Sequence, residues 1–154
     1  MLAKKSGNGE HWIDSEEKYA IPIRTTACPC CGKNEMQQEV IDFYTFLFRF
    51  ADKEDLYITS GYRCPKHNEI IGGAKDSAHV KGTALDIAIT DKLTILYAAA
   101  EMGSKLFPGG TGIGFYPKGH GNIVHIDRRI ISARWIKLEK YQNFTMQLKK
   151  EYLK

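Results

Sequence analysis

The segment SAHVKGTALDIAI, residues 77–89, combines a histidine and an aspartate with an alternating apolar run. From residue 83 to residue 89, leucine and isoleucine alternate with alanine and Asp86. A repeat of two residues is typical of a β-strand, in which successive side chains point to opposite faces. We therefore predict a strand over 83–89 that buries its apolar face and carries Asp86 on the other face, a short distance after His79.

A second segment, NIVHIDRR at 122–129, shows the same alternation. His125 and Asp127 share one face of the predicted strand, and valine and isoleucine occupy the other face. Polar groups on an inner strand cost free energy unless they have partners. We therefore expect His125 and Asp127 to contact other polar groups or a bound ion.

His79, Asp86 and His125 together have the composition of a catalytic zinc site. Such sites use three ligands of the histidine or carboxylate type and leave a fourth position for water. Each of the three residues, taken alone, has the ordinary alternative of a hydrogen-bonded side chain. We favour zinc ligation because it accounts for a carboxylate and an imidazole on two predicted inner strands.

The rest of the chain alternates between predicted helices and strands. Strands flanked by helices, with a hairpin late in the chain, predict one α+β domain built around a small antiparallel sheet. The further predicted elements are a helix over 34–52 with Asn34 as N-cap, a strand over 56–63, a helical turn over 65–73, a helix over 91–103 with Gly103 just past its end, and a strand over 111–117 joined to 122–129 by the turn KGHG.

The composition of the chain limits the classes of protein to which it can belong. The chain has 154 residues, of which 43% are hydrophobic and 26% charged, values that suit one globular domain. No run approaches the ~18 apolar residues of a membrane span, and the first residues lack the apolar region of a secretory signal. We therefore expect synthesis in the cytoplasm without a cleavable signal. A net charge of +4 with no binding motif gives no reason to expect nucleic acid as a partner.

Four cysteines are grouped unevenly. Cys28, Cys30 and Cys31 occur in ACPCCGKN, and Cys64 follows in GYRCP. The spacing from Cys28 to Cys31 is that of a zinc-binding pair, but a second such pair is missing. The sequence leaves three outcomes open, namely a metal site, a disulfide, and free thiols that are small and buried.

The order of the motifs resembles the zinc D-Ala-D-Ala carboxypeptidase family of peptidoglycan peptidases, whose fold is shared with the Hedgehog signalling domain. The similarity extends from Ala27 to the ARW at 133–135. The motifs that carry it are SGYR at 60–63, GGA at 72–74, SAHVKGTALD at 77–86 and HID at 125–127.

The resemblance implies roles for particular residues. His79, Asp86 and His125 would be the zinc ligands, Arg63 would hold the carboxylate of the peptide, and Ser77 would line the site. For Arg63, the alternative is a surface salt bridge. Arginine suits the family role because its planar fork can donate two parallel hydrogen bonds to a carboxylate.

The general base is less clear from the motifs. Several branches of the family place an acid three residues before the last histidine ligand, and here that residue is Asn122, which cannot accept a proton at neutral pH. We predict Asp127 as the base or as the residue that orients His125, with His120 as the alternative base.

The implied function is hydrolysis of a peptide bond in peptidoglycan stem peptides by zinc-activated water, as a carboxypeptidase or an endopeptidase. The small size and the expected lack of an export signal suggest a phage or prophage product, either an endolysin or a virion component, that acts at the bacterial cell wall. The alternative is a catalytically weak zinc-containing module of the same fold that binds the cell wall or a protein.

The sequence also suggests how the chain is divided. We expect an N-terminal extension over 1–26, the zinc peptidase domain over 27–136, and an amphipathic C-terminal helix over 137–154. This helix would pack on the domain or on a second copy, so that the protein is a monomer or a homodimer. A second interpretation is that its lysines attract anionic wall polymers.

Overall fold

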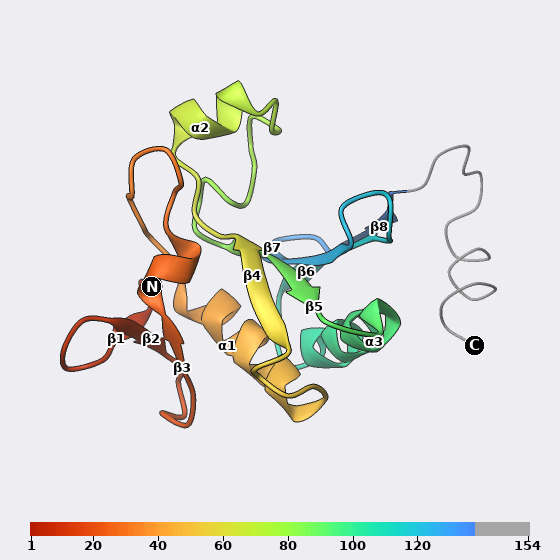
Figure 1. Cartoon of the computed structure of the whole chain (residues 1–154), viewed down its shortest axis with the longest axis horizontal. Coiled ribbons are helices and arrows are strands. Elements are labelled where there is room, and N and C mark those ends of the chain that lie inside the picture. The colour runs from red at the N-terminus through yellow and green to blue at the C-terminus, as the bar shows by residue number, and fades with distance from the viewer. Residues whose placement is uncertain (138–154) are drawn as a thin grey trace.

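The computed structural model describes residues 1–137, so the helix expected over 137–154 lies outside the described residues except for Lys137. Figure 1 shows the whole arrangement. The elements in chain order are β1 (Lys4–Lys5), β2 (His11–Ile13), β3 (Ala20–Pro22), the 3-10 turn η1 (Ile23–Thr26), α1 (Gln38–Phe46), the 3-10 turn η2 (Leu47–Arg49), β4 (Leu56–Ser60), α2 (Pro65–Ile70), β5 (Ala84–Ile89), α3 (Leu93–Ser104), β6 (Gly110–Tyr116), β7 (Ile123–Arg129) and β8 (Ala133–Ile136).

A five-stranded sheet forms the centre of the fold, with the strand order β4-β5-β7-β6-β8. All neighbouring strands are antiparallel except β8, which pairs parallel to β6. Helices α1 and α3 lie together along the sheet, and α2 lies apart from them (Figure 1). The predicted α+β class is thus confirmed. The sheet is antiparallel as expected apart from the edge strand β8, which the sequence had not predicted.

The core lies between the sheet and helices α1 and α3. Tyr97 of α3 contacts Phe115 of β6 edge to face, with ring centroids 5.5 Å apart. The apolar residues of the central strands are buried on this side, as the alternation predicted. They are Leu85, Ile87, Ile113, Phe115, Val124 and Ile126.

Helix α1 is shorter than the predicted 34–52. It begins at Gln38, because Gln37 is extended and its N–H donates to the carbonyl of Gly82 (2.9 Å). Asn34 is not the N-cap. Its side chain instead donates to the carbonyl of Ile23 (2.7 Å) and accepts from the hydroxyl of Thr26 (2.9 Å).

Gly103 lies inside α3 and not past its end, so this boundary was also predicted wrongly. A Cβ at Gly103 would be 2.8 Å from the ring of Phe46 and 3.2 Å from that of Phe43. The glycine therefore allows α3 to approach the aromatic residues of α1, and the helix continues to Ser104.

Residues 1–26 form a second, small sheet in the order β1-β2-β3. Trp12 of β2 is 2% exposed, and its indole N–H donates to the hydroxyl of Thr26 (2.9 Å). Ile21 of β3 belongs to the same hydrophobic core as α1. The segment expected to be an extension therefore packs into the domain.

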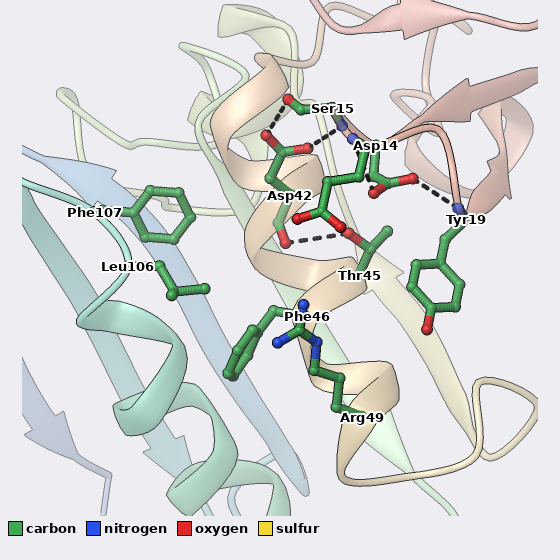
Figure 2. A pocket seen from close by; sticks show the side chains of 10 residues that line it. Asp14, Ser15, Tyr19, Asp42, Thr45, Phe46, Arg49, Leu106 and Phe107 are labelled. Carbon is green, nitrogen blue, oxygen red and sulfur yellow. Dashed lines mark hydrogen bonds between the residues drawn. The ribbon is translucent and has the colours of Figure 1, made fainter.

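A pocket of about 270 Å³ lies beside α1 (Figure 2). Its acidic side chains are already paired: Asp14 accepts from the backbone N–H of Lys18 and of Tyr19, and Asp42 accepts from Ser15. None of its lining residues is a predicted site residue. Among the helices of residues 1–137, none is long and apolar enough to cross a membrane.

Candidate metal centre and active site

His79, Asp86 and His125 meet on the face of the sheet opposite α1 and α3. Oδ1 of Asp86 lies 2.8 Å from Nδ1 of His125 and 3.3 Å from Nε2 of His79. The two imidazole rings are edge to face, with centroids 5.2 Å apart. All three residues are buried, so the predicted ligand set is brought together in one place.

Two strands and one loop position these three side chains. Asp86 of β5 is the direct antiparallel partner of His125 of β7, so their side chains project from the same face. His79 lies in the loop before β5, and its N–H donates to the hydroxyl of Ser77 (3.2 Å). Gly82 has a φ of +72°, a left-handed conformation that turns the loop into β5.

The second nitrogen of each imidazole is also held. Nδ1 of His79 lies 2.8 Å from the carbonyl of Gly61, which can only accept, so this nitrogen carries the proton. Nε2 of His125 lies 2.7 Å from Oδ2 of Asp127. Such partners fix the tautomer and the orientation of metal-binding histidines. They also direct Nε2 of His79 and Nδ1 of His125 at Asp86, so that the three groups could share a cation in place of their mutual hydrogen bonds, a donor set that suits zinc.

The two carboxylates of the site are held in their ionised form. Burial would raise the pKa of Asp86, but hydrogen bonds from His125 and His79 outweigh it and hold the pKa well below its usual range. Burial would likewise raise the pKa of Asp127, and hydrogen bonds from Arg129 and His125 lower it overall. Burial lowers the pKa of His125, but its bonds to Asp127 and Asp86 raise it more. Both carboxylates therefore stay ionised at neutral pH.

Arg63 reaches the same site from the end of β4. Its Nη2 is 3.5 Å from Oδ2 of Asp86, and the guanidinium also donates to Ser60 (3.4 Å) and to Asn68 (3.3 Å). The side chain is 15% exposed, so its ion pair with Asp86 lies below the surface of the protein. Ser77 is near the group through its bond to the backbone of His79, so its hydroxyl supports the loop.

A family model described as peptidase M15 matches residues 20–127, from β3 to Asp127. The chain belongs to the peptidase M15 family. The resemblance to D-Ala-D-Ala carboxypeptidase-like zinc peptidases is thereby confirmed. No curated protein sequence gives a significant match. The chain is thus a peptidase by family, and the matched segment contains all three predicted metal ligands.

Asp127 of this M15 peptidase is fully buried and surrounded by donors. Besides His125, its carboxylate accepts from the N–H of Gly112 (3.0 Å) and from Nε of Arg129 (2.7 Å). A Cβ at Gly112 would be 2.4 Å from Oδ2 of Asp127, so the glycine makes room for the carboxylate. These donors hold the carboxylate in place beside His125.

The other candidates near the base position lie at the turn between β6 and β7. His120 is half-buried in this turn, and its backbone N–H donates to the carbonyl of Pro117 (2.8 Å). Asn122 is exposed and has a φ of +56° immediately before β7. His120 does not belong to the group in which His79, Asp86 and His125 meet.

Sequence reasoning missed one wall of the M15 site. Trp135 of β8 lies with its ring centroid 5.2 Å from that of His125, and its indole N–H donates to the hydroxyl of Tyr116 (2.8 Å). Gly114 leaves the space, since a Cβ there would be 2.4 Å from the indole nitrogen. Gly112 and Gly114 alternate on the ligand face of β6, and this spacing was the available signal.

Proposed function

We propose that this M15 peptidase is a zinc enzyme that hydrolyses a peptide bond in peptidoglycan stem peptides. The observation that supports it best is the convergence of His79 Nε2, Asp86 and His125 Nδ1, with the other nitrogen of each imidazole fixed. A zinc ion bound by these residues would polarise the scissile carbonyl and make a water molecule more acidic. The chain's own residues bind and orient the peptide around it.

Arg63 binds a carboxylate of the stem peptide. Its guanidinium lies at the edge of the ligand group and is held in place by Ser60 and Asn68, so little freedom is lost when a peptide binds. Two parallel hydrogen bonds from the planar fork would fix the peptide relative to the scissile bond. Ser77 holds the loop that carries His79.

The test is hydrolysis of purified muropeptides, with the products identified by mass. Loss of one terminal D-Ala identifies a D,D-carboxypeptidase, whereas two larger fragments identify an endopeptidase. Protein treated with a chelator is the control, and activity should return when zinc is added. A zinc-loaded protein that leaves every muropeptide intact would contradict the proposal.

The second candidate is a zinc-containing module that binds the cell wall or a protein without turnover. It is favoured by Asn122, which stands where several branches of the family have an acid. Sedimentation of the protein with purified sacculi, without any change in muropeptide mass, would support it. Turnover by the wild-type protein would exclude it.

Replacing Arg63 with lysine should lower kcat/KM by about 10-fold or more, which corresponds to roughly 1.4 kcal/mol of lost transition-state binding. Lysine keeps the charge but cannot donate two parallel bonds to a carboxylate. Steady-state kinetics on the muropeptide that the wild type cleaves are the measurement. The matched control is Arg24→Lys at an exposed arginine. Equal kinetics for wild type, Arg63→Lys and Arg63→Ala would show that Arg63 does not bind the carboxylate of the substrate.

Replacing Asp127 with asparagine separates its two predicted roles. If Asp127 orients His125, zinc affinity should fall by about 10- to 100-fold, and excess zinc should restore most of the turnover. If Asp127 is the general base, kcat should fall and stay low at saturating zinc. Zinc titration followed by kinetics distinguishes the two. His120→Asn is the companion variant. A large fall in kcat in that variant alone would identify His120 as the general base.

A further inference from the structure

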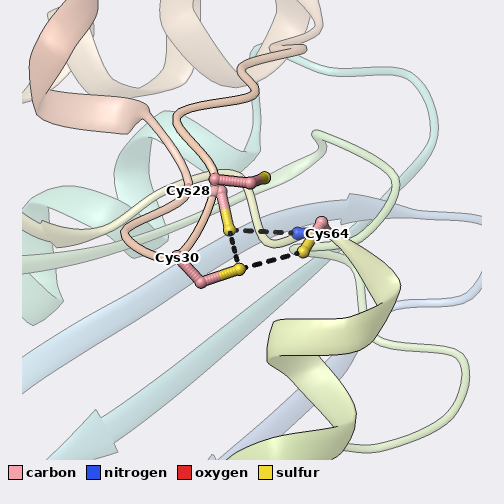
Figure 3. A group of neighbouring side chains, drawn as sticks. Cys28, Cys30 and Cys64 are labelled. Atoms are coloured by element: carbon pink, nitrogen blue, oxygen red, sulfur yellow. Dashed lines mark hydrogen bonds between the residues drawn. The ribbon is translucent and has the colours of Figure 1, made fainter.

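Four cysteines from two separate segments meet at one place, away from His79, Asp86 and His125. Figure 3 shows Cys28 and Cys30 on one loop facing Cys64 at the start of α2. The Sγ atoms of these residues and of Cys31 all lie within 4.8 Å of one another. The chain therefore concentrates all of its thiols around a single point.

The distances between the sulfur atoms suit a shared metal ion. Sγ of Cys30 is 3.6 Å from that of Cys28 and 3.3 Å from that of Cys64. Four sulfurs bound tetrahedrally to zinc at ~2.3 Å are about 3.8 Å apart. A disulfide joins only two sulfurs, at about 2.0 Å, so it does not explain why Cys30 is close to two partners at once.

The backbone around the cysteines is arranged for sulfur ligands. The loop is closed by the N–H of Gly32 donating to the carbonyl of Cys28 (2.8 Å), and Gly32 has a φ of +76°. The N–H of Cys64 donates to Sγ of Cys28, and the N–H of His67 donates to Sγ of Cys64, both at 3.4 Å. N–H groups that point at sulfur stabilise the thiolate, which is the form that binds metal.

The interpretation as small buried thiols does not fit the exposure of the cysteines. Cys28 is buried, but Cys30 and Cys31 are exposed. Burial of apolar surface therefore gives no reason for these two thiols to turn toward Cys28 and Cys64.

We propose that Cys28, Cys30, Cys31 and Cys64 bind a structural zinc ion, separate from the catalytic ion. Four protein ligands leave no open position for water, so this ion holds segments together and takes no part in hydrolysis. Cys64 directly follows Arg63 and caps α2. The ion therefore ties the loop before α1 to the residue that binds the substrate carboxylate.

Cobalt substitution tests this site without relying on activity. The full-length protein is stripped of metal under reducing conditions and titrated with Co²⁺. Thiolate ligands give an intense charge-transfer band in the near ultraviolet, which two histidines and one carboxylate cannot give. The wild type and His79→Ala should both show the band, whereas Cys31→Ser should bind cobalt at this site at least 10-fold more weakly.

A variant that keeps four ligands controls for the possibility that Cys31→Ser fails to fold. Cys31→His keeps four ligands, so it should stay folded and retain about three-quarters of the charge-transfer intensity, since three thiolates remain of four. Absence of the band in reduced wild type would overturn the proposal. So would a count of fewer than four free thiols in protein purified without reductant and then denatured, because it would reveal a disulfide. Loss of the band only in His79→Ala would also overturn the proposal, because the band would then depend on the other candidate site.

Discussion

Replacing His79 with alanine should abolish hydrolysis of muropeptides and remove one zinc ion per chain. His79 is 3% exposed, and its Nε2 is one of the three atoms that meet at the candidate metal centre. Two remaining ligands hold zinc weakly, and a catalytic metal supplies several kcal/mol of transition-state stabilisation. The rate should therefore fall by about 10³-fold or more. Elemental analysis of the purified protein and muropeptide kinetics are the measurements.

The control for this variant is His11→Ala, a histidine of β2 that belongs to neither metal-ligand group. It should keep the wild-type zinc content and rate. The thiolate-to-cobalt band should persist in His79→Ala, which would show that the zinc ion lost from this variant is not the one proposed at the cysteines. Unchanged zinc content and rate in His79→Ala would show that His79 is not a ligand.

Replacing Gly82 with alanine should destabilise the domain by roughly 3 kcal/mol or more, a sum of backbone strain and overpacking. Gly82 has a φ of +72°, and an added Cβ would lie 1.8 Å from the carbonyl oxygen of Glu35. The obstacle is backbone just before α1, which cannot rotate away as a side chain can. The melting temperature should fall by roughly 6–12 °C for a chain of this size.

Gly72→Ala is the matched control. Gly72 has nearly the same conformation, with a φ of +74°, but a Cβ there would meet nothing within 4 Å. It should therefore show only the cost of the left-handed backbone, about 1–2 kcal/mol. Thermal unfolding of the two variants isolates the contact with Glu35. Equal melting temperatures for both would show that the loop before β5 is not fixed against the start of α1.

The inner strands, and the residues that meet on their polar face, could be predicted from sequence because their signal is local. The alternation in 83–89 and 122–129 separates the core face from the polar face. Both strands are central, so this pattern survives folding, and Asp86 and His125 become direct partners. The motif resemblance pointed to the same residues independently.

The predictions from sequence were wrong or incomplete where an element depends on contacts with residues far away along the chain. Helix α1 starts late because Gln37 pairs with Gly82, more than forty residues away along the chain. The strand β8 has four residues and is defined by its pairing with β6, which nothing in its own composition indicates. The environment of Asp127 needed Gly112 from another strand. The periodicity of one segment does not show which distant segment it will contact.

The cysteines illustrate the same limit. Cys64 is 36 residues from Cys28, so spacing alone could not show that the two thiols approach each other. The sequence therefore left metal, disulfide and free thiols open, with buried thiols as the ordinary interpretation. Only the packing of the start of α2 against the loop of Cys28 places four sulfurs around one point.

The strand order β4-β5-β7-β6-β8 has a consequence for synthesis on the ribosome. As the chain emerges, β5 can pair with β4 at once, but its other edge stays open until β7 has been made. That open edge is a template for aggregation, so the nascent chain is most vulnerable while α3 and β6 are being translated. Because β7 carries His125 and Asp127, the pairing that closes this edge also places His125 beside Asp86. The step that closes the aggregation-prone edge is therefore the same step that brings the candidate metal ligands together.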